Sequence, residues 1–198
     1  MATYDIVIRN GQVADGTGKA LFAADVAVKG NRIVAVDAPG TLRSDNEFDA
    51  AGKVVAPGFI DVHTHDDQIV LASPQMLPKI SQGVTTVVVG NCGISLAPLV
   101  HPKVPPPLNL LGGDDKHVYP TMASYAAAVE AARPAVNVAA LVGHSTLRVA
   151  TMDDPYRPAT AREQAEMCAL LREGMEAGAI GLSSGVFYAP GAAADVRS

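Results

Sequence analysis

The spacing of hydrophobic residues changes near position 57 and divides the chain into two parts. Before that position, short stretches of alternating apolar and polar residues are separated by Gly, Asn and Asp, a pattern typical of strands and tight turns. After it, continuous apolar runs alternate with stretches of helical periodicity, as in parallel sheets with crossover helices. We therefore expect a small, mostly antiparallel β-sandwich-like module at residues 1–56 and an α/β unit at residues 57–198.

The first part is expected to consist of short strands and to serve a structural role. The pairs Asn10-Gly11 and Gly30-Asn31 are typical of two-residue hairpin loops, so the chain is expected to reverse direction at both places. The expected strands cover residues 4–9, 12–14, 24–29, 32–36 and 54–56.

The second part follows a strand–helix order. Its apolar runs predict strands at residues 59–63, 84–89, 136–142 and 179–182. Ser73-Pro74 is typical of a helix start and Gly83 of its end. A capping box at Thr160 predicts a last helix to about residue 177, with Cys168 on its buried face. A further helix is expected at residues 121–132, after a proline-rich lid or binding loop at residues 98–120.

The first candidate for chemistry is His63-Thr64-His65, at the end of the first strand of the second part. Side chains two positions apart on a strand point to the same face, so both imidazoles and the Asp61 carboxylate are expected together. Imidazole suits zinc, copper, iron and nickel. The alternative is a pair of surface histidines without a metal. In the metal-binding interpretation, Asp61 is expected to accept a hydrogen bond beneath the site.

Cys92 and His144 follow later strands, and the carboxyl ends of parallel strands are where chemistry gathers. Cys92 stands in a Gly-Asn-Cys-Gly turn, from which its thiolate could join the imidazoles on zinc; the alternative is a small buried apolar residue. His144 could bind the metal, contact a substrate, orient another group or be purely structural. Ser183 and Ser184 lack a neighbouring general base and a Gly-x-Ser-x-Gly elbow, so a serine hydrolase is disfavoured.

Composition narrows the choice of partners. The chain of 198 residues is 48% hydrophobic with a net charge of -5, which argues against nucleic acid as its main partner. It has no apolar run of the roughly 18 residues that a membrane span needs, and its first residues alternate like a strand and unlike a signal peptide. Its 2 cysteines make no disulfide framework, so a cytoplasmic location is expected. Neither a Gly-x-Gly-x-x-Gly sequence nor a P-loop indicates a nucleotide cofactor.

The run from Pro57 to His65, following a small β module, resembles the amidohydrolase superfamily, and the chain is most similar to its D-aminoacylase (N-acyl-D-amino-acid deacylase) family. The resemblance is carried by residues 63–67, 78–86, 90–95, 143–148, 181–185 and 187–188. His-x-His marks the superfamily, whereas Gly-Asn-Cys-Gly-Ile-Ser is specific to the family. The resemblance implies a TIM-type (β/α)8 barrel with a metal centre at its mouth.

The resemblance also implies roles for individual residues. His63 and His65 match histidines that bind a loosely held second metal, and Cys92 matches the cysteine that ligates a tightly bound Zn2+. Phe187 resembles a residue that lines the pocket for the substrate's apolar side chain. Phe187 and Tyr188 are expected to shape that pocket, with His144 as a further substrate contact.

Chains of this family are considerably longer than this one. Their remaining zinc ligands and their catalytic aspartate lie beyond the position of Ser198, so the catalytic residue of this chain stays unknown. A TIM barrel needs roughly 200–250 residues or more. We therefore expect residues 57–198 to form a partial TIM-type barrel of about four β/α units, the N-terminal half of the complete barrel.

The expected activity is zinc-dependent hydrolysis of the amide bond of N-acyl-D-amino acids, which yields a D-amino acid and a carboxylate. The alternative enzyme is a cyclic-amide hydrolase of the hydantoinase or dihydroorotase kind. A lysine at the fourth strand would favour it, and this chain has Ser183-Ser184 there. The third hypothesis is a non-catalytic half-barrel with a structural role, whose uncovered sheet edge would favour self-association.

Overall fold

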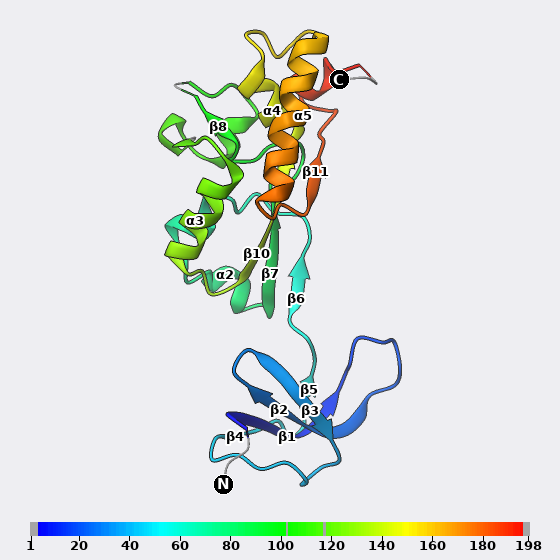
Figure 1. Cartoon of the computed structure of the whole chain (residues 1–198). Coiled ribbons are helices and arrows are strands. Elements are labelled where there is room, and N and C mark those ends of the chain that lie inside the picture. Colours follow the sequence, from blue (N-terminus) through cyan, green and yellow to red (C-terminus); the bar gives the residue numbers. More distant parts are fainter. Residues whose placement is uncertain (1–3, 102, 117, 196–198) are drawn as a thin grey trace. The chain divides into compact units, whose positions relative to one another are not determined.

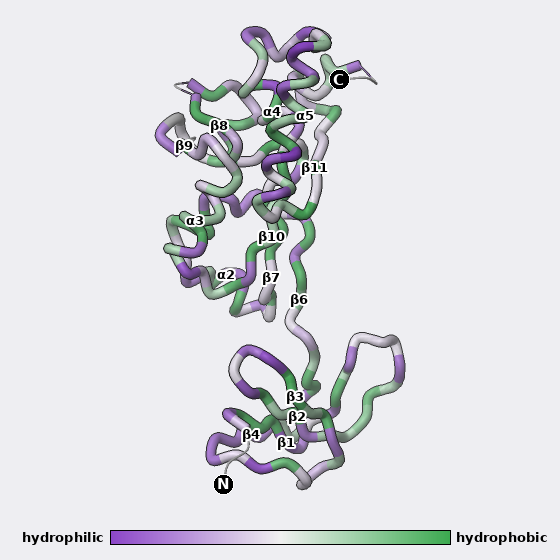
Figure 2. Tube along the Cα trace, in the orientation of Figure 1, coloured by the Kyte–Doolittle hydropathy of each residue, from purple (hydrophilic) through white to green (hydrophobic). Residues whose placement is uncertain are grey.

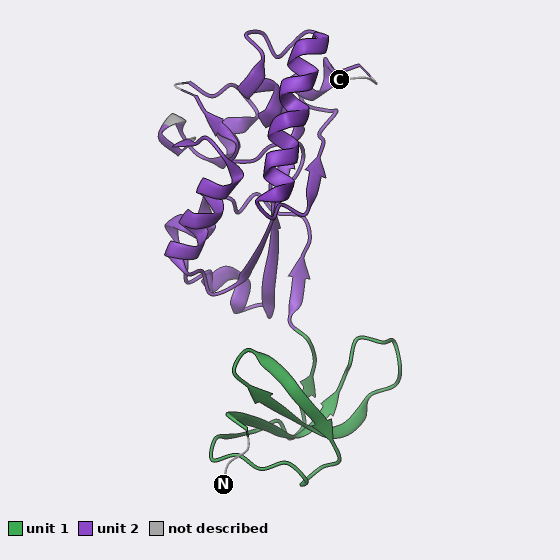
Figure 3. Cartoon of the chain, viewed as in Figure 1, with its two compact units in different colours: residues 1–57 green, residues 58–198 purple. Residues whose placement is uncertain are grey.

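The computed structural model describes residues 4–101, 103–116 and 118–195, and Figure 1 labels the elements of the chain. The chain divides into two compact units between Pro57 and Gly58 (Figure 3). In the described part of the chain, every helix is too short or too polar to cross a membrane.

The first unit is built around β1, the central strand of a five-stranded sheet. The strands are β1 (Ile6–Val13), β2 (Phe22–Lys29), β3 (Arg32–Asp37), β4 (Glu47–Asp49) and β5 (Val54–Val55). β1 pairs antiparallel with β2, and β2 with β3, whereas β4 and β5 lie parallel to β1. Val7 and Ala27 are fully buried in one small apolar cluster, and Val13 and Val26 belong to a second.

Asn10-Gly11 does not form the expected hairpin turn. β1 continues through it, and its register with β2 shifts between Ile8 and Gly11, so the pair forms a β-bulge. Asn10 has a left-handed φ of 61°. A side chain at Gly11 would lie 2.6 Å from a methyl group of β5, so glycine is needed for the two strands to approach. The hairpin predicted at Gly30-Asn31 is confirmed, since it joins β2 to β3.

The second unit contains a curled parallel sheet accompanied by helices (Figure 1). Its strands are β6 (Phe59–Asp61), β7 (Val84–Val89), β10 (Asn137–Gly143) and β11 (Gly181–Ser183), in the order β11-β10-β7-β6. Its α-helices are α1 (Ile69–Ala72), α2 (Leu77–Ile80), α3 (Met122–Ala132), α4 (His144–Thr151), α5 (Ala161–Glu176) and α6 (Ala189–Ala192). Neighbouring strands pair in parallel, as the alternation of apolar runs and helical stretches predicts.

The core of the second unit lies between the two central strands and the helices. Val87 and Val89 of β7 and Val142 of β10 are fully buried, and Met122 of α3 and Met167 of α5 belong to the same cluster. Figure 2 shows the apolar residues along these strands. Burial of the central strands explains why their sequences are nearly continuous apolar runs.

The prediction that a helix begins at Ser73-Pro74 is wrong. α1 starts earlier, and Ser73 is its C-cap residue, whose N–H donates to the Ile69 carbonyl at 2.8 Å. Proline disfavours helical backbone in the residue before it and has no N–H of its own, so the helix stops there. The single turn of α2 begins only after Met76.

The described part of residues 98–120, the proline-rich stretch expected to be a lid or binding loop, contains short regular elements. These elements are the two short strands β8 (Leu99–Val100) and β9 (Val118–Tyr119) and the two 3-10 helices η1 (Leu108–Leu111) and η2 (Asp114–Lys116). Leu108 and Leu111 are buried in the core cluster. The stretch therefore contributes side chains to the core, while Val100, Leu110 and Val118 are exposed.

The capping box predicted at Thr160 is confirmed. The Thr160 hydroxyl accepts the Glu163 N–H at 3.3 Å, and the Glu163 carboxylate accepts the Thr160 N–H at 2.8 Å. The predicted buried face of α5 is wrong, since Cys168 is exposed while Met167 and Gly174 are buried. A side chain at Gly174 would lie 2.8 Å from a methyl group of β10, so this close approach sets the rotation of the helix.

Replacing Thr160 with alanine is expected to lower the free energy of unfolding by about 1 kcal/mol, because α5 loses the hydroxyl that caps its first turn. Urea unfolding followed by circular dichroism measures the change. Thr160→Ser keeps the hydroxyl and is the matched control. An alanine variant as stable as the wild type would show that the cap contributes nothing.

Glu163 is expected to make the stability depend on pH. Hydrogen bonds from Arg157, and then from the Thr160 N–H, lower the pKa of the Glu163 carboxyl to about 2. Because this pKa lies below the ordinary value of 4.5, the stabilisation is present above that pH and is lost as pH falls through about 2. Acidification from about pH 5 to about pH 3 should therefore destabilise the wild type more than Glu163→Gln in urea unfolding. Equal losses in the two proteins would contradict this.

Candidate metal centre

His63 and His65 follow β6 but are not part of it. The strand ends at Asp61, so the alternation expected to place both imidazoles on one face does not reach them. Thr64, between the two histidines, is buried and donates its N–H and its hydroxyl to the Val88 carbonyl, at 3.2 and 2.9 Å. These bonds attach the segment to the end of β7, and the two histidine ring centres lie 6.0 Å apart.

Lys79 of α2 joins the two ends of the histidine segment. Its Nζ lies 2.7 Å from Asp61 Oδ2 and 3.0 Å from Asp66 Oδ2. The hydrogen bond from Lys79 is the main cause that lowers the pKa of the Asp61 carboxyl. Asp61 therefore accepts a hydrogen bond from an ammonium group, and its Oδ1 also accepts the His63 main-chain N–H at 3.4 Å.

Cys92 lies in a turn of positive backbone angles after β7. The φ angle is 79° at Gly90, 55° at Cys92 and 77° at Gly93. A side chain at Gly90 would lie 2.1 Å from a carbonyl oxygen of β10, so only glycine lets the turn pass this strand. The Asn91 side-chain amide donates to the Val88 carbonyl at 2.8 Å, which ties the turn to the end of β7.

The turn brings the Cys92 thiol to the two imidazoles. Cys92 Sγ lies 2.9 Å from His63 Nε2, and one ligand atom from each of His63, His65 and Cys92 lies within 4.8 Å of the others. His65 Nδ1 is buried and has no hydrogen-bond partner among the described residues. Burial, and to a lesser degree His63, lowers the pKa of His65 and favours the neutral ring that metals bind. Zinc accepts imidazole nitrogen and thiolate sulfur together, so this donor set fits zinc.

Asp67 anchors the chain just beyond the histidine segment. The residue is 1% exposed, and its carboxylate accepts the Gly90 N–H at 3.2 Å. Its main-chain carbonyl accepts the Tyr125 hydroxyl at 2.8 Å. Burial raises the pKa of Asp67 to about 7. These contacts tie Asp67 to the turn that follows β7 and to α3.

The expected substrate contacts do not belong to the donor cluster. His144 begins α4 directly after β10 and lines a hollow of about 360 Å³ with residues that include Leu182 and Val186. Its Nε2 is buried without a hydrogen-bond partner among the described residues, and burial lowers its pKa. The rings of Phe187 and Tyr188 contact each other with centres 5.7 Å apart. Phe187 is 90% exposed, so the structure leaves its ring at the surface.

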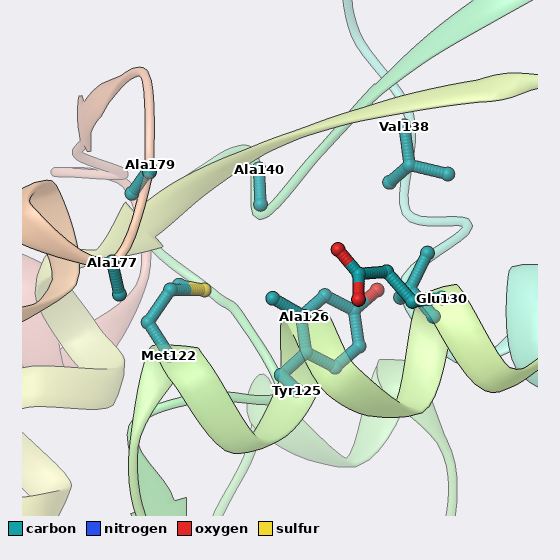
Figure 4. Close-up of a pocket in the computed structure, with 10 residues that line it drawn as sticks. Met122, Tyr125, Ala126, Glu130, Val138, Ala140, Ala177 and Ala179 are labelled. Atoms are coloured by element: carbon teal, nitrogen blue, oxygen red, sulfur yellow. The ribbon is translucent and has the colours of Figure 1, made fainter.

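A separate hollow of about 170 Å³ lies between α3 and β10 (Figure 4). Met122 and Tyr125 of α3 and Val138 and Ala140 of β10 are among the residues that line it. None of the candidate metal or substrate residues is part of its lining. We therefore assign this hollow to the packing of helix on sheet.

Thr64, Lys79 and Ser183 support the centre although no expectation singled them out for this. Lys79 contacts Asp61 across 18 positions of sequence, and the Ser183 hydroxyl contacts Gly93 across 90. Local sequence patterns carry no signal for contacts over such separations. Only the place of Ser183 at a strand end pointed toward the site.

Comparison with known proteins identifies relatives of this chain. A family model described as amidohydrolase family matches residues 46–195. An N-acyl-D-aspartate deacylase of Alcaligenes xylosoxydans xylosoxydans is 51% identical over 197 residues, which cover 98% of this chain and 39% of the relative. A D-aminoacylase of the same organism is 49% identical over 191 residues, with coverage of 96% and 40%. The chain spans about two fifths of the length of these curated relatives.

Solved structures are similar in fold. A crystal structure of D-aminoacylase matches with a TM-score of 0.93 and 51% identity, over 97% of this chain and 40% of that chain. An N-acyl-D-glutamate deacylase from Bordetella bronchiseptica, complexed with zinc and a phosphonate that mimics the tetrahedral intermediate, matches with a TM-score of 0.91 and 47% identity, at the same coverage of 97% and 40%. An L-hydantoinase from Arthrobacter aurescens shares the fold alone, at 18% identity and a TM-score of 0.52, over 91% of this chain and 32% of that chain.

Lys79→Met is expected to loosen the histidine segment, because Asp61 and Asp66 lose their shared cation. The free energy of unfolding should fall by up to about 1 kcal/mol, the range of partly exposed ion pairs. Amide exchange at residues 63–65 should become faster than in the wild type, as measured by NMR. Replacing the exposed Lys19 with methionine is the control and should change neither quantity. Amide exchange at residues 63–65 that is as slow in Lys79→Met as in the wild type would show that the ion pairs of Lys79 do not hold the histidine segment.

Proposed function

The chain belongs to the amidohydrolase family, and we propose that it supplies part of a zinc centre that hydrolyses the amide bond of N-acyl-D-amino acids. The observation that carries this proposal is the cluster of His63, His65 and Cys92, whose ligand atoms lie within 4.8 Å of one another. A deacylase relative of the same fold is complexed with zinc and a mimic of a tetrahedral intermediate. Because the chain spans about two fifths of its relatives' length, we propose a contribution to the centre and not the whole of it.

We also propose that residues 57–198 form the N-terminal half of a TIM-type barrel, about four β/α units, preceded by a β-sandwich-like module at residues 1–56. The parallel order of β6, β7, β10 and β11 and the likeness to D-aminoacylase, with a TM-score of 0.93, support this. The candidate ligands follow the carboxyl ends of β6 and β7. TIM-barrel enzymes build their active sites at this end of the strands.

Cys92, His65 and Lys79 have distinct parts in the proposed centre. Bound zinc would lower the pKa of a water molecule toward about 7 and polarise the acyl carbonyl. Cys92 would bind as a thiolate, and His65 as a neutral ring whose buried Nδ1 has no hydrogen-bond partner in the described chain. Lys79 holds Asp61 and Asp66, so that these carboxylates do not compete for the metal.

We propose that His144, Phe187 and Tyr188 contact the N-acyl-D-amino acid. The buried Nε2 of His144 borders a hollow and offers a hydrogen bond to a polar group of the substrate. The exposed Phe187 ring offers apolar surface to the substrate side chain. The family resemblance assigns the general base to a carboxylate beyond position 198, so we assign this role to none of the described residues.

The other hypotheses have less support. β11 ends in Ser183, followed by Ser184, where a lysine would favour a cyclic-amide hydrolase, and the likeness to a hydantoinase extends only to the fold. A non-catalytic role with self-association through the uncovered sheet edge after the fourth strand, β11, stays a prediction. A cytoplasmic location and the lack of nucleic-acid and membrane partners also stay predictions.

Chain purified in the presence of zinc is expected to hold about one zinc ion, measured by inductively coupled plasma mass spectrometry. Cys92→Ala should lose most of this metal, because the thiolate completes the donor set with the two imidazoles. Cys168→Ala, which removes the exposed cysteine of α5, is the matched control and should keep it.

Two results would refute the metal centre: a wild-type chain without zinc, or a Cys92→Ala variant that keeps it. Release of D-methionine from N-acetyl-D-methionine, with the L enantiomer as the control substrate, tests the reaction itself.

A further inference from the structure

Cys92 has a backbone conformation that its own side chain disfavours. Its φ of 55° lies in the left-handed region, which residues other than glycine occupy rarely and only where surrounding contacts hold them. The direction of the thiol depends on this conformation, because the Cα–Cβ bond turns with the main chain. The contacts that hold the turn from Gly90 to Gly93 therefore determine where the thiol points.

The Ser183 hydroxyl holds this turn on both sides of Cys92. It donates to the Gly90 carbonyl and accepts the Gly93 N–H at 3.0 Å. A hydroxyl has one donor and two acceptor sites, so a single side chain satisfies both main-chain groups. The two bonds connect the end of β11 to the turn that follows β7.

The main chains of the two segments lie in direct contact at this point. A side chain at Gly185 would lie 2.1 Å from the Cys92 carbonyl oxygen, and one at Gly93 would lie 2.9 Å from the Gly185 nitrogen. Both distances are too short for a carbon atom, so the two glycines are what allow Ser183 to reach the turn. The neighbouring Ser184 instead lines the hollow beside His144.

We infer that Ser183 is a positioning residue, whose hydroxyl fixes the turn so that the Cys92 thiolate faces His63. For its functional meaning this inference rests on the metal centre proposed above. It gives β11 a defined part in that centre, although β11 contributes no residue to the clustered ligand atoms in the described chain. If Ser183 only satisfied buried main-chain groups, its loss would lower stability and leave the thiol unchanged.

The test compares Ser183→Ala with Ser183→Thr, which keeps the hydroxyl, and with the adjacent control Ser184→Ala. All variants are made in a Cys168→Ala chain, so that Cys92 is the one remaining cysteine. The probe is Co2+, whose thiolate charge-transfer absorption reports its bond to sulfur and whose affinity is measured by competition with a chelator.

Ser183→Ala is expected to weaken Co2+ binding about 10–100-fold and to reduce the thiolate absorption, as is usual when a residue that orients a metal ligand is lost. Ser183→Thr and Ser184→Ala should stay within about twofold of the parent chain. Affinity and absorption at the parent values in Ser183→Ala, together with a lower midpoint of unfolding, would overturn the inference.

A second measurement needs no metal. In Ser183→Ala, alkylation of Cys92 by iodoacetamide and amide exchange at Gly93 should become about five to ten times faster, the effect of losing one net hydrogen bond. If no variant and not even the parent chain binds Co2+, the proposed metal centre fails, and the alkylation rate of Cys92 decides the inference, because Gly93 loses its acceptor in Ser183→Ala whether or not the thiol changes direction. An alkylation rate equal to that of the parent chain would then overturn the inference as well.

Discussion

The carbonyl oxygen of Val88 is the atom on which the candidate centre depends. It accepts the Thr64 N–H at 3.2 Å, the Thr64 hydroxyl at 2.9 Å and the Asn91 side-chain amide at 2.8 Å. Thr64 lies between the two histidines and Asn91 lies next to Cys92, so one acceptor fixes both parts of the donor set. The residues on either side of Val88 are fully buried. Close packing therefore prevents this carbonyl from moving without disturbing the core.

Sequence patterns whose partners are neighbours along the chain predicted the structure well. The β-branched run at residues 84–89 matches β7 over its whole length, Gly30-Asn31 joins two antiparallel strands, and the capping box at Thr160 is formed. The turn and the capping box form from contacts within a few residues, and the β-branched run needs only to be buried. Contacts with distant parts of the chain therefore rarely change these structures.

Patterns that are compatible with more than one local structure were less reliable. Asn10-Gly11 has the composition of a hairpin loop, but β1 finds its partners in β2, β4 and β5, so the pair becomes a bulge. Ser73-Pro74 has the composition of a helix start, but a helix already under way ends there. For the centre, strand alternation fails because β6 is too short, whereas the gathering of parallel strand ends accounts for the closeness of Cys92 to the histidines.

Three carboxylates flank the donor set, and each is engaged elsewhere. Asp61 and Asp66 lie 2.7 and 3.0 Å from the Lys79 ammonium, and Asp67 is buried with its carboxylate on the Gly90 N–H. Carboxylates free to point at a cation would favour calcium or magnesium, which prefer oxygen ligands. With two of these carboxylates paired to Lys79 and the third buried, imidazole and thiol are the donors presented by the cluster, and they suit zinc. The ion pairs and the burial around the cluster thus determine the chemical character of the proposed centre, even though the groups involved are not its ligands.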